Sequence, residues 1–382
     1  MILLRSIKMI NVVEVKTYRQ KKLFATFPLK LYKDCPYYVP SFRSDEMNTM
    51  NPKKNFSLAY CTVRCFLAYK DGKLSGRIAG IIQHKYNEIS GRKCIRFSRF
   101  ECIDDFDVAT ALIGAVEKMG KENGMNVLHG PWGFNDTDRE GLLTYGYDKR
   151  STYATNYSFP YMKDFVERMG FEEEAHWVEN RVTTPPAPFE KSVRVAELVK
   201  KRYKVKDVTE TMNVKQIVKK YGDKWFETYN EAYSDLDGFV PVEGKEKKNV
   251  LKQFATIINT DFFSCVVDED GEVAGFGVVL CDICPALIKH KGKLFPIGFI
   301  DFLKAIKHPK RVEMALVGLK HKYKNSGINA IIINKISDSL IKYKIPYIET
   351  NPTLVTNDSI QLQWKFMETE IIKERKTYSK NI

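Results

Sequence analysis

The sequence lacks any uncharged apolar run of the roughly 18 residues that a membrane-spanning helix needs. Its opening residues, MILLRSIKMINVV, are interrupted by Arg5 and Lys8 and contain no small-residue cleavage site. We therefore expect a cytoplasmic protein whose eight cysteines stay reduced. Peripheral contact with the inner face of a membrane stays open as a further expectation.

The spacing of a zinc site is also missing. Cys281 and Cys284 form a single CxxC pair, and no second pair or histidine follows at a suitable distance. We therefore expect no metal. Motifs for sequence-specific DNA binding are missing too, and nucleic acid is not an expected partner.

Basic residues, in contrast, are abundant. The 382 residues carry 61 Lys and Arg against 47 Asp and Glu, a formal net charge of +14. Residues 289–344 hold 13 of these basic side chains and only three acids. Such a bias favours anionic partners, namely a polyphosphate cofactor, anionic lipid or nucleic acid, although a solvated lysine-rich surface is an equally good interpretation.

Two passages of the chain look alike. FLAYKDGKLSGRIAGII, from Phe66, and SCVVDEDGEVAGFGVVL, from Ser264, each read as two strands joined by an Asp-Gly turn. In both halves a further strand, a long helix, a strand, a short helix and a last strand are expected to follow. The pattern predicts a mixed α/β fold with two similar units, and an insertion before the long helix of the second unit.

The prolines of TTPPAPFEKS (183–192) interrupt both structural periods. We therefore predict an N-terminal unit over residues 1–190 and a C-terminal unit over residues 191–382. Residues 18–34 are expected to form an additional helix, and residues 193–260 a mostly helical lead-in to the second unit.

The stretch YKNSGIN (323–329) lies between a buried strand, VEMALVGL, and a helix with an isoleucine stripe. Gly327 allows the backbone to approach a ligand closely, and the first N–H groups of the helix carry partial positive charge. These are the parts of an anion site, but a solvated basic turn is an equally simple interpretation. The matching stretch of the first half, ECIDDFDVAT, has no glycine and three aspartates, which would repel phosphate.

The second half resembles the GNAT acyltransferase superfamily, whose pyrophosphate loop reads Gln/Arg-x-x-Gly-x-Gly/Ala. Here residues 324–329 (KNSGIN) stand at those positions, with Lys324 for Gln/Arg and Asn329 for the final small residue. Nearly the whole chain is similar to the tandem bacterial group that includes YghO and ceramide synthase-like proteins. Blocks such as YKDCPYYVPSFRSDE (32–46) and HGPWGFNDTDREGLLTYGYD (129–148) carry this resemblance.

The resemblance implies two tandem GNAT-like acyl-CoA N-acyltransferase units, of which the first has a degenerate cofactor loop. The implied reaction moves an acyl group from acetyl-CoA or a longer acyl-CoA to an amine, including a lipid (sphingoid-type) amine. Two alternatives stay open: an aminoacyl-tRNA-dependent transferase of the Fem type, and a non-catalytic binding or regulatory protein. A monomer and a homodimer are both compatible with the sequence.

The resemblance also suggests site residues. Acyl-CoA is expected at Leu319, Lys324, Asn325, Ser326, Gly327, Ile328 and Asn329. For catalysis we predict Glu349, which follows a buried strand, and Asp282; the simpler interpretations are an exposed strand-end acid and a turn residue. For substrate binding we predict Asn351, Asn357, Tyr233, Phe239 and Phe295, although capping or core packing would also explain them.

Many relatives use a tyrosine seven residues after an asparagine to protonate the leaving thiolate. In this chain Trp364 stands seven residues after Asn357, and an indole has no acidic hydroxyl. The group that would protonate the thiolate is therefore not predicted.

Overall fold

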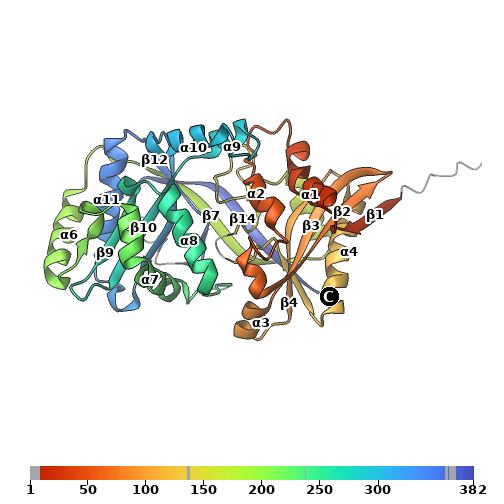
Figure 1. Cartoon of the computed structure of the whole chain (residues 1–382), viewed down its shortest axis with the longest axis horizontal. Helices are drawn as coiled ribbons and strands as arrows, with labels where there is room; N and C mark the ends of the chain where they lie inside the picture. Colours follow the sequence, from red (N-terminus) through yellow and green to blue (C-terminus); the bar gives the residue numbers. More distant parts are fainter. Residues whose placement is uncertain (1–8, 136–137, 237, 358–359, 361–366) are drawn as a thin grey trace, which may run out of the picture. The chain divides into compact units, whose positions relative to one another are not determined.

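The computed structural model describes residues 9–135, 138–236, 238–357, 360 and 367–382 (Figure 1). The chain divides into two compact units. Unit 1 extends to Trp177 and also contains Leu287–Lys293 and Lys373–Ile382, whereas unit 2 contains Val178–Ala286 and Leu294–Ile372.

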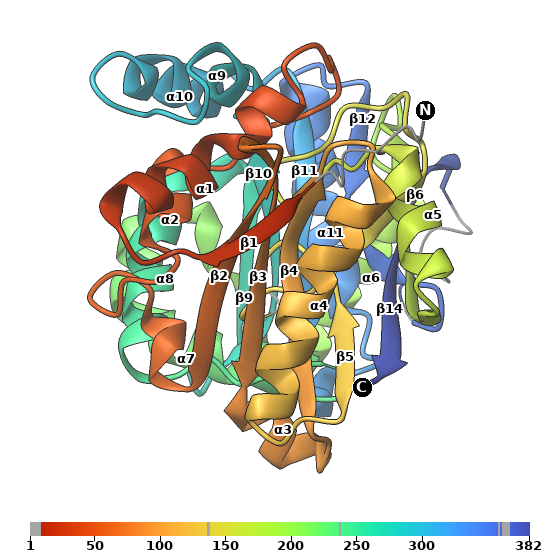
Figure 2. The ribbon, with the colours of Figure 1, turned by 90° about the vertical axis from the view of Figure 1, so that its right-hand side faces the viewer.

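Unit 1 is built on a mixed sheet with the strand order β1-β2-β3-β4-β5-β14. Its strands are β1 Ile10–Glu14, β2 Cys61–Lys70, β3 Lys73–Gln83, β4 Cys94–Cys102, β5 Val127–Gly130 and β6 Leu142–Tyr145. Its helices are α1 Tyr18–Leu31, α2 Arg43–Asn48, α3 His84–Ser90, α4 Phe106–Glu122 and α5 Pro160–Arg168. Helix α4 lies across one face of the sheet (Figure 2) and buries Val108, Leu112 and Val116, which recur at helical spacing.

Unit 2 repeats this plan with the strand order β7-β12-β11-β10-β9-β8. Its strands are β8 Lys206–Asp207, β9 Phe263–Val267, β10 Val273–Cys281, β11 Val312–Leu319, β12 Tyr347–Thr350 and β13 Thr353–Leu354. Its helices are α6 Glu190–Tyr203, α7 Val214–Tyr233, α8 Gly244–Ile257, α10 Gly298–Lys307 and α11 Ile328–Lys342. Helix α9 (Cys284–Lys289) and strands β7 (Glu172–Thr183) and β14 (Thr369–Asn381) contribute residues to both units.

The two faces of the unit 2 sheet have separate cores because successive strand residues point to opposite faces. Val266 and Val279 pack with the buried isoleucines of α11. Their neighbours Cys265 and Val278 pack instead with the aromatic residues of α7. The sheet is therefore covered on both sides, which explains why its strands are so uniformly apolar.

The predicted internal repeat is confirmed. In unit 1 the hairpin β2–β3 is followed by β4, α4 and β5, and in unit 2 the hairpin β9–β10 is followed by β11, α11 and β12. Positive φ angles of 49° at Asp71 and 75° at Gly72 form the first Asp-Gly turn. The predicted insertion is also present, because residues 282–311 connect β10 to β11 where residues 84–93 connect β3 to β4.

Each unit contains a strand from the end of the other half of the sequence. β14 pairs antiparallel with β5 of unit 1, with Tyr378 opposite Gly130, as the adjacent blue and yellow strands of Figure 2 show. β7 pairs antiparallel with β12 of unit 2, with Thr183 opposite Tyr347. A single boundary at residue 190 therefore does not describe the compact units, because the two halves of the sequence exchange their final strands.

The helical expectations for residues 18–34 and 193–260 correspond to α1 and to α6, α7 and α8. The expected short helix near Leu362 falls on residues 361–366, which lie outside the described residues. None of the helices in the described part of the chain has the length and apolar character that crossing a membrane requires.

The exchange of strands predicts that the C-terminus stabilises unit 1. Tyr378 is 2% exposed and packs in the unit 1 core. We expect Tyr378→Ala to lower the free energy of unfolding by about 3 kcal/mol, since it removes a buried aromatic ring. Urea unfolding measures this loss. Tyr18→Ala, at a residue that is 76% exposed, is the control and should have little effect; equal effects of the two changes would contradict the exchange.

Candidate acyl-CoA site

In unit 2, β11 and β12 run parallel for three residue pairs and then separate. Val312, Glu313 and Met314 pair with Ile348, Glu349 and Thr350. β12 ends at Thr350, whereas β11 continues to Leu319. Residues 315–319 thus have one edge without a strand partner in the described part of the chain, and this edge leads directly to the loop that precedes α11.

Two residues predicted to bind substrate border this open edge. The side-chain amide of Asn351 donates a hydrogen bond to the Ala315 carbonyl over 3.3 Å, and the Tyr233 hydroxyl donates to the Val317 carbonyl over 3.3 Å. Oδ1 of Asn351 is buried and accepts no hydrogen bond from the described residues. A buried acceptor of this kind is costly unless a ligand or water satisfies it.

The loop at the end of β11 places Gly327 in the left-handed conformation (φ 86°) immediately before α11. A Cβ atom at Gly327 would meet Cγ2 of Val199 at 3.1 Å, so glycine is required by backbone geometry and by the packing of α6. Ser326 Oγ accepts the N–H of Ile328 over 3.2 Å. Among the described residues, the N–H groups of Asn325, Gly327 and Asn329 have no hydrogen-bond acceptor.

The lysines of this loop are paired with acids. Lys320 pairs with Glu272 at 3.0 Å, Lys322 with Asp268 at 3.1 Å, and Lys324 with Asp235 at 2.8 Å. The Lys324 ammonium accordingly lowers the pKa of Asp235. Both side chains of the Lys324 pair are at least half exposed, and exposed ion pairs of this kind are weak enough for a phosphate to compete.

The corresponding helix N-terminus of unit 1 already holds an anion of its own. Asp105 caps α4 by accepting the Val108 N–H over 3.2 Å, and it forms an ion pair with Lys70. Burial alone would raise the pKa of Asp105, but these two contacts lower it. Its carboxylate therefore fills the position that the glycine of unit 2 leaves open.

An acidic cluster lies at the other end of β11. Glu313 and Cys284 are buried, and their ligand atoms and a carboxylate oxygen of Asp282 lie within 4.8 Å of one another. Asp282 also accepts the Cys284 N–H over 3.0 Å. Glu313 was not predicted as a site residue, although a charged residue within the apolar strand VEMALVGL could have indicated a functional role. These groups could ligate a cation, and the expectation of no metal stays a prediction.

Glu349 is 1% exposed, so it is not the exposed strand-end acid that was considered for it. Its carboxylate forms an ion pair with Arg311, and Arg181 lies 3.8 Å away. Because Glu349 and Glu313 pair in register on adjacent strands, their side chains lie on the same face of the sheet. The two arginines therefore stabilise the charge of the buried Glu349 carboxylate.

The other predicted residues are more dispersed. Phe239 is buried in the core beside Tyr233, as the simpler interpretation held, and Asn357 caps a turn by accepting the Ile360 N–H over 3.4 Å. Phe295 is 73% exposed and stacks on Phe299. Leu319 and Ile328 pack under α11 at either end of the loop. Trp364 lies outside the described residues.

A cavity elsewhere in unit 2 contains none of the predicted site residues. It has a volume of about 560 Å³ and is lined by Lys204, Lys206, Lys220 and Lys224, together with residues 267–271. Its position at the β9–β10 hairpin sets it apart from the open edge of β11.

No family model matches the chain, but two curated proteins are similar to it over most of its length. The protein YghO of Escherichia coli is 25% identical over 96% of this chain and 95% of its own length. Bacterial ceramide synthase of Caulobacter vibrioides is 26% identical over 83% of this chain and 82% of its own length.

Solved structures show the same fold over the whole chain. A tandem GNAT protein from the clavulanic acid biosynthesis pathway superposes with a TM-score of 0.57 at 9% identity, covering 98% of both chains. A GCN5-related N-acetyltransferase from Sphaerobacter thermophilus gives a TM-score of 0.51 at 9% identity, covering 97% of this chain and 95% of its own.

The chain has the tandem GNAT fold.

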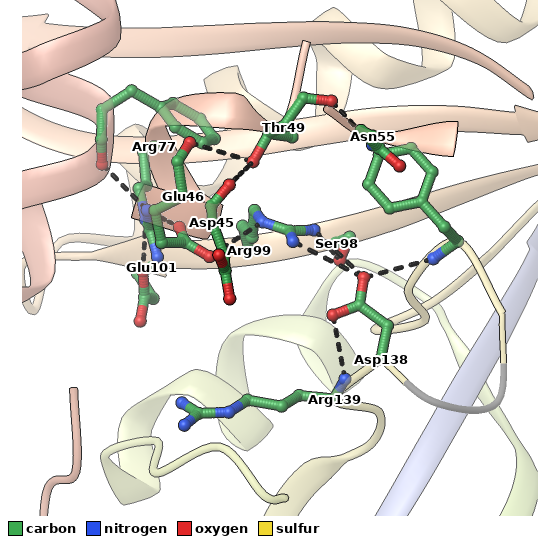
Figure 3. A network of polar contacts seen from close by, with 12 residues as sticks. Asp45, Glu46, Thr49, Asn55, Arg77, Ser98, Arg99, Glu101, Asp138 and Arg139 are labelled. Carbon is green, nitrogen blue, oxygen red and sulfur yellow. Dashed lines mark hydrogen bonds and ion pairs between the residues drawn. The ribbon is translucent and has the colours of Figure 1, made fainter. Parts of the chain in front are cut away.

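The sheet of unit 1 carries a network of buried charges (Figure 3). Arg77 of β3 pairs with Glu46 of α2 at 2.6 Å and with Glu101 of β4 at 2.5 Å. Arg99, which has a positive φ of 50°, pairs with Glu46 at 3.2 Å and with Asp138 at 3.5 Å. Carboxylates of unit 1 itself therefore satisfy the cations beside β4.

The pKa values of the two carboxylates that pair with Arg77 are shifted in opposite directions. Burial would raise the pKa of Glu46, but the charges of Arg77 and Arg99 lower it to about 2. Burial raises the pKa of Glu101, against the effect of Arg77, and the charge of Glu46 raises it further. Glu46 is thus the carboxylate that the network holds ionised.

This difference predicts an acid-sensitive contribution to stability. Because the folded-state pKa of Glu46 is depressed, its contribution is complete above pH 4.5 and is lost as pH falls towards 2. We expect Glu46→Gln to destabilise the chain by about 3 kcal/mol at pH 7, and by clearly less at pH 3. Urea unfolding at both pH values measures this.

Glu190→Gln, at an exposed residue, is the matched control and should change little at either pH. The stability contributed by Glu101 changes with pH in the opposite direction, because the pKa of Glu101 is raised. The Glu46→Gln variant removes only the carboxylate whose pKa is lowered. A destabilisation by Glu46→Gln that is as large at pH 3 as at pH 7 would contradict the assignment.

Proposed function

We propose that unit 2 is an acyl-CoA-dependent N-acyltransferase that moves an acyl group from a CoA thioester to an amine. The observation that carries this proposal is the open edge of β11, which ends at the three free N–H groups of residues 325–329. The similarity to a protein named bacterial ceramide synthase and the GNAT fold support the same chemistry.

The donor would lie along β11. Its pyrophosphate would accept hydrogen bonds from the N–H groups around Gly327, at the positive end of α11. Its amide groups would pair with the free edge of residues 315–319 and with the orphan Oδ1 of Asn351. The thioester supplies an activated acyl carbon, and Lys324 would add charge once it exchanges Asp235 for a phosphate.

Acyl transfer also needs an oxyanion donor and a proton acceptor. The ladder between β10 and β11 shifts at Ala315, since Val278 pairs with Leu316 and Val279 with Met314. A bulge re-aims backbone groups, and we assign the Ala315 N–H to the oxyanion. As the C–N bond forms, the C–S bond of the thioester breaks and CoA leaves as a thiolate, which is protonated in turn. We assign acceptance of the ammonium proton to the carboxylates of Asp282 and Glu313, with Glu349 as a charge fixed by Arg311.

The acceptor proposed is a lipid amine of the sphingoid type, because one relative is named a ceramide synthase. Two nearby carboxylates suit a cationic amine. The donor would be acetyl-CoA or a longer acyl-CoA.

Acyl-CoA binding can be tested at Ser326. Ser326→Asp keeps a side-chain oxygen that can accept the Ile328 N–H, but places a carboxylate among the N–H groups of the loop. We expect micromolar binding of acetyl-CoA or palmitoyl-CoA by the wild type, and a loss of about tenfold or more in the variant, with unchanged thermal unfolding. Isothermal titration calorimetry measures both affinities.

Thr17→Asp is the control, since Thr17 is the N-cap residue of α1 in unit 1, where its hydroxyl accepts the Gln20 N–H. It should leave acyl-CoA affinity unchanged. Gly327→Trp should also abolish binding, but it would disturb the contact with Val199. No binding by the wild type would reject the proposed pyrophosphate site around Gly327 and would favour the tRNA-dependent or regulatory alternatives.

The proton acceptor can be tested at Glu313. With palmitoyl-CoA and sphinganine as probes, Glu313→Gln should lower kcat about 100-fold or more while acyl-CoA affinity stays constant. Glu269→Gln, at an exposed residue, is the control. Acyl-CoA binding without turnover by the wild type would identify a non-catalytic binding protein, and full activity of Glu313→Gln would reject this residue as the base.

A further inference from the structure

The segment inserted between β10 and β11 exposes an unusual number of large apolar side chains. Phe295, Ile297, Ile300 and Leu303 are 73%, 64%, 66% and 42% exposed. All four belong to unit 2 and fall within nine residues of α10 and the turn before it. Phe302 is buried on the opposite side of the helix, so α10 is anchored through one face and presents the other to solvent.

Lysines flank this apolar face. Lys304 and Lys307 lie in the last turns of α10, and Lys310 follows the helix; all three are exposed. Within the described residues none of them forms an ion pair. Over residues 294–310 the only acid is Asp301. Lys304 and Lys307 lie four and seven residues after Ile300, so the surface combines apolar side chains with a cationic border at its C-terminal end.

We propose that α10 and residues 294–297, here called the α10 surface, form an interfacial anchor that binds an anionic lipid bilayer. An amphipathic helix of this kind lies in the plane of the interface, with its apolar side chains among the acyl chains. Lysine stems can cover apolar surface while their ammonium groups reach lipid phosphates. A protein partner would need a matching acidic rim, whereas an anionic bilayer supplies negative charge all around the inserted face.

This proposal does not rest on the acyltransferase assignment, although the two fit together. A lipid amine acceptor is embedded in a membrane. The α10 surface belongs to the segment between β10 and β11 that also contains Asp282 and Cys284. The matching connection of unit 1, residues 84–93, is 20 residues shorter (30 residues over 282–311 against 10). The α10 surface therefore lies in the inserted segment of unit 2, which has no counterpart in residues 84–93 of unit 1.

The test is co-sedimentation of the full chain with vesicles. We expect binding to vesicles of phosphatidylglycerol and phosphatidylcholine, weakened by salt, and little binding to pure phosphatidylcholine. Ile300→Glu with Leu303→Glu should weaken partitioning about tenfold or more, because each change places a charge in the apolar interface. Leu198→Glu is the matched control, since Leu198 is 68% exposed on α6 of the same unit.

The cationic border is tested separately. The triple change of Lys304, Lys307 and Lys310 to Glu should remove most of the dependence on phosphatidylglycerol. The same change at Lys201, Lys215 and Lys219, which are also exposed, keeps the net charge equal and serves as the control. Equal losses for the two triple variants would show a nonspecific charge effect and overturn the assignment.

Three further outcomes would overturn the proposal: no binding of the wild type to anionic vesicles, equal weakening by Leu198→Glu, or a dimer that the Ile300→Glu, Leu303→Glu variant dissociates. The last would make the α10 surface an interface between two copies. Acyl-CoA titration of the same variant separates the two proposals, because the affinity should stay at the wild-type value whether or not vesicles bind.

Discussion

The hydrogen bonding of the two exchanged strands is the constraint on which both units depend. Without β14 the unit 1 sheet would end at the four residues of β5, and without β7 the unit 2 sheet would end at the four residues of β12. Short unpaired strands at a sheet edge are unstable and prone to pair elsewhere. The exchange therefore completes each sheet with a strand from the other half of the sequence.

Within this shared plan, the two units treat the same position in opposite ways. The helix after the fourth strand begins with Asp105 in unit 1 and with Gly327 in unit 2. A carboxylate satisfies the N–H groups of α4 internally, whereas the glycine leaves N–H groups of its loop available to an external anion. Unit 1 holds a carboxylate at this position and unit 2 leaves it open to a ligand, and both follow from side-chain chemistry at equivalent places in one fold.

Buried charge is distributed accordingly. In unit 1, Arg77 and Arg99 are matched by carboxylates from α2 and β4, which holds Glu46 ionised. In unit 2, Glu349 is matched by Arg311, while Glu313 and Asp282 gather beside Cys284. The carboxylates of unit 2 lie at the start of the strand along which the donor is proposed to bind, and this position is the physical reason for assigning proton transfer to them.

The sequence by itself determined the repeat, the Asp-Gly hairpins, the helix of isoleucines and the glycine loop, because these follow from local periodicity and backbone preference. It also indicated the GNAT fold through motifs that resemble that family. Only the tertiary structure decided the strand exchange, the ion pair of Glu349 with Arg311 and the place of Glu313 beside Asp282, since each joins residues distant in sequence. The tertiary structure also decided that Phe239 lies in the core and Phe295 at the surface. The sequence does not separate these two cases, because phenylalanine occurs in both environments.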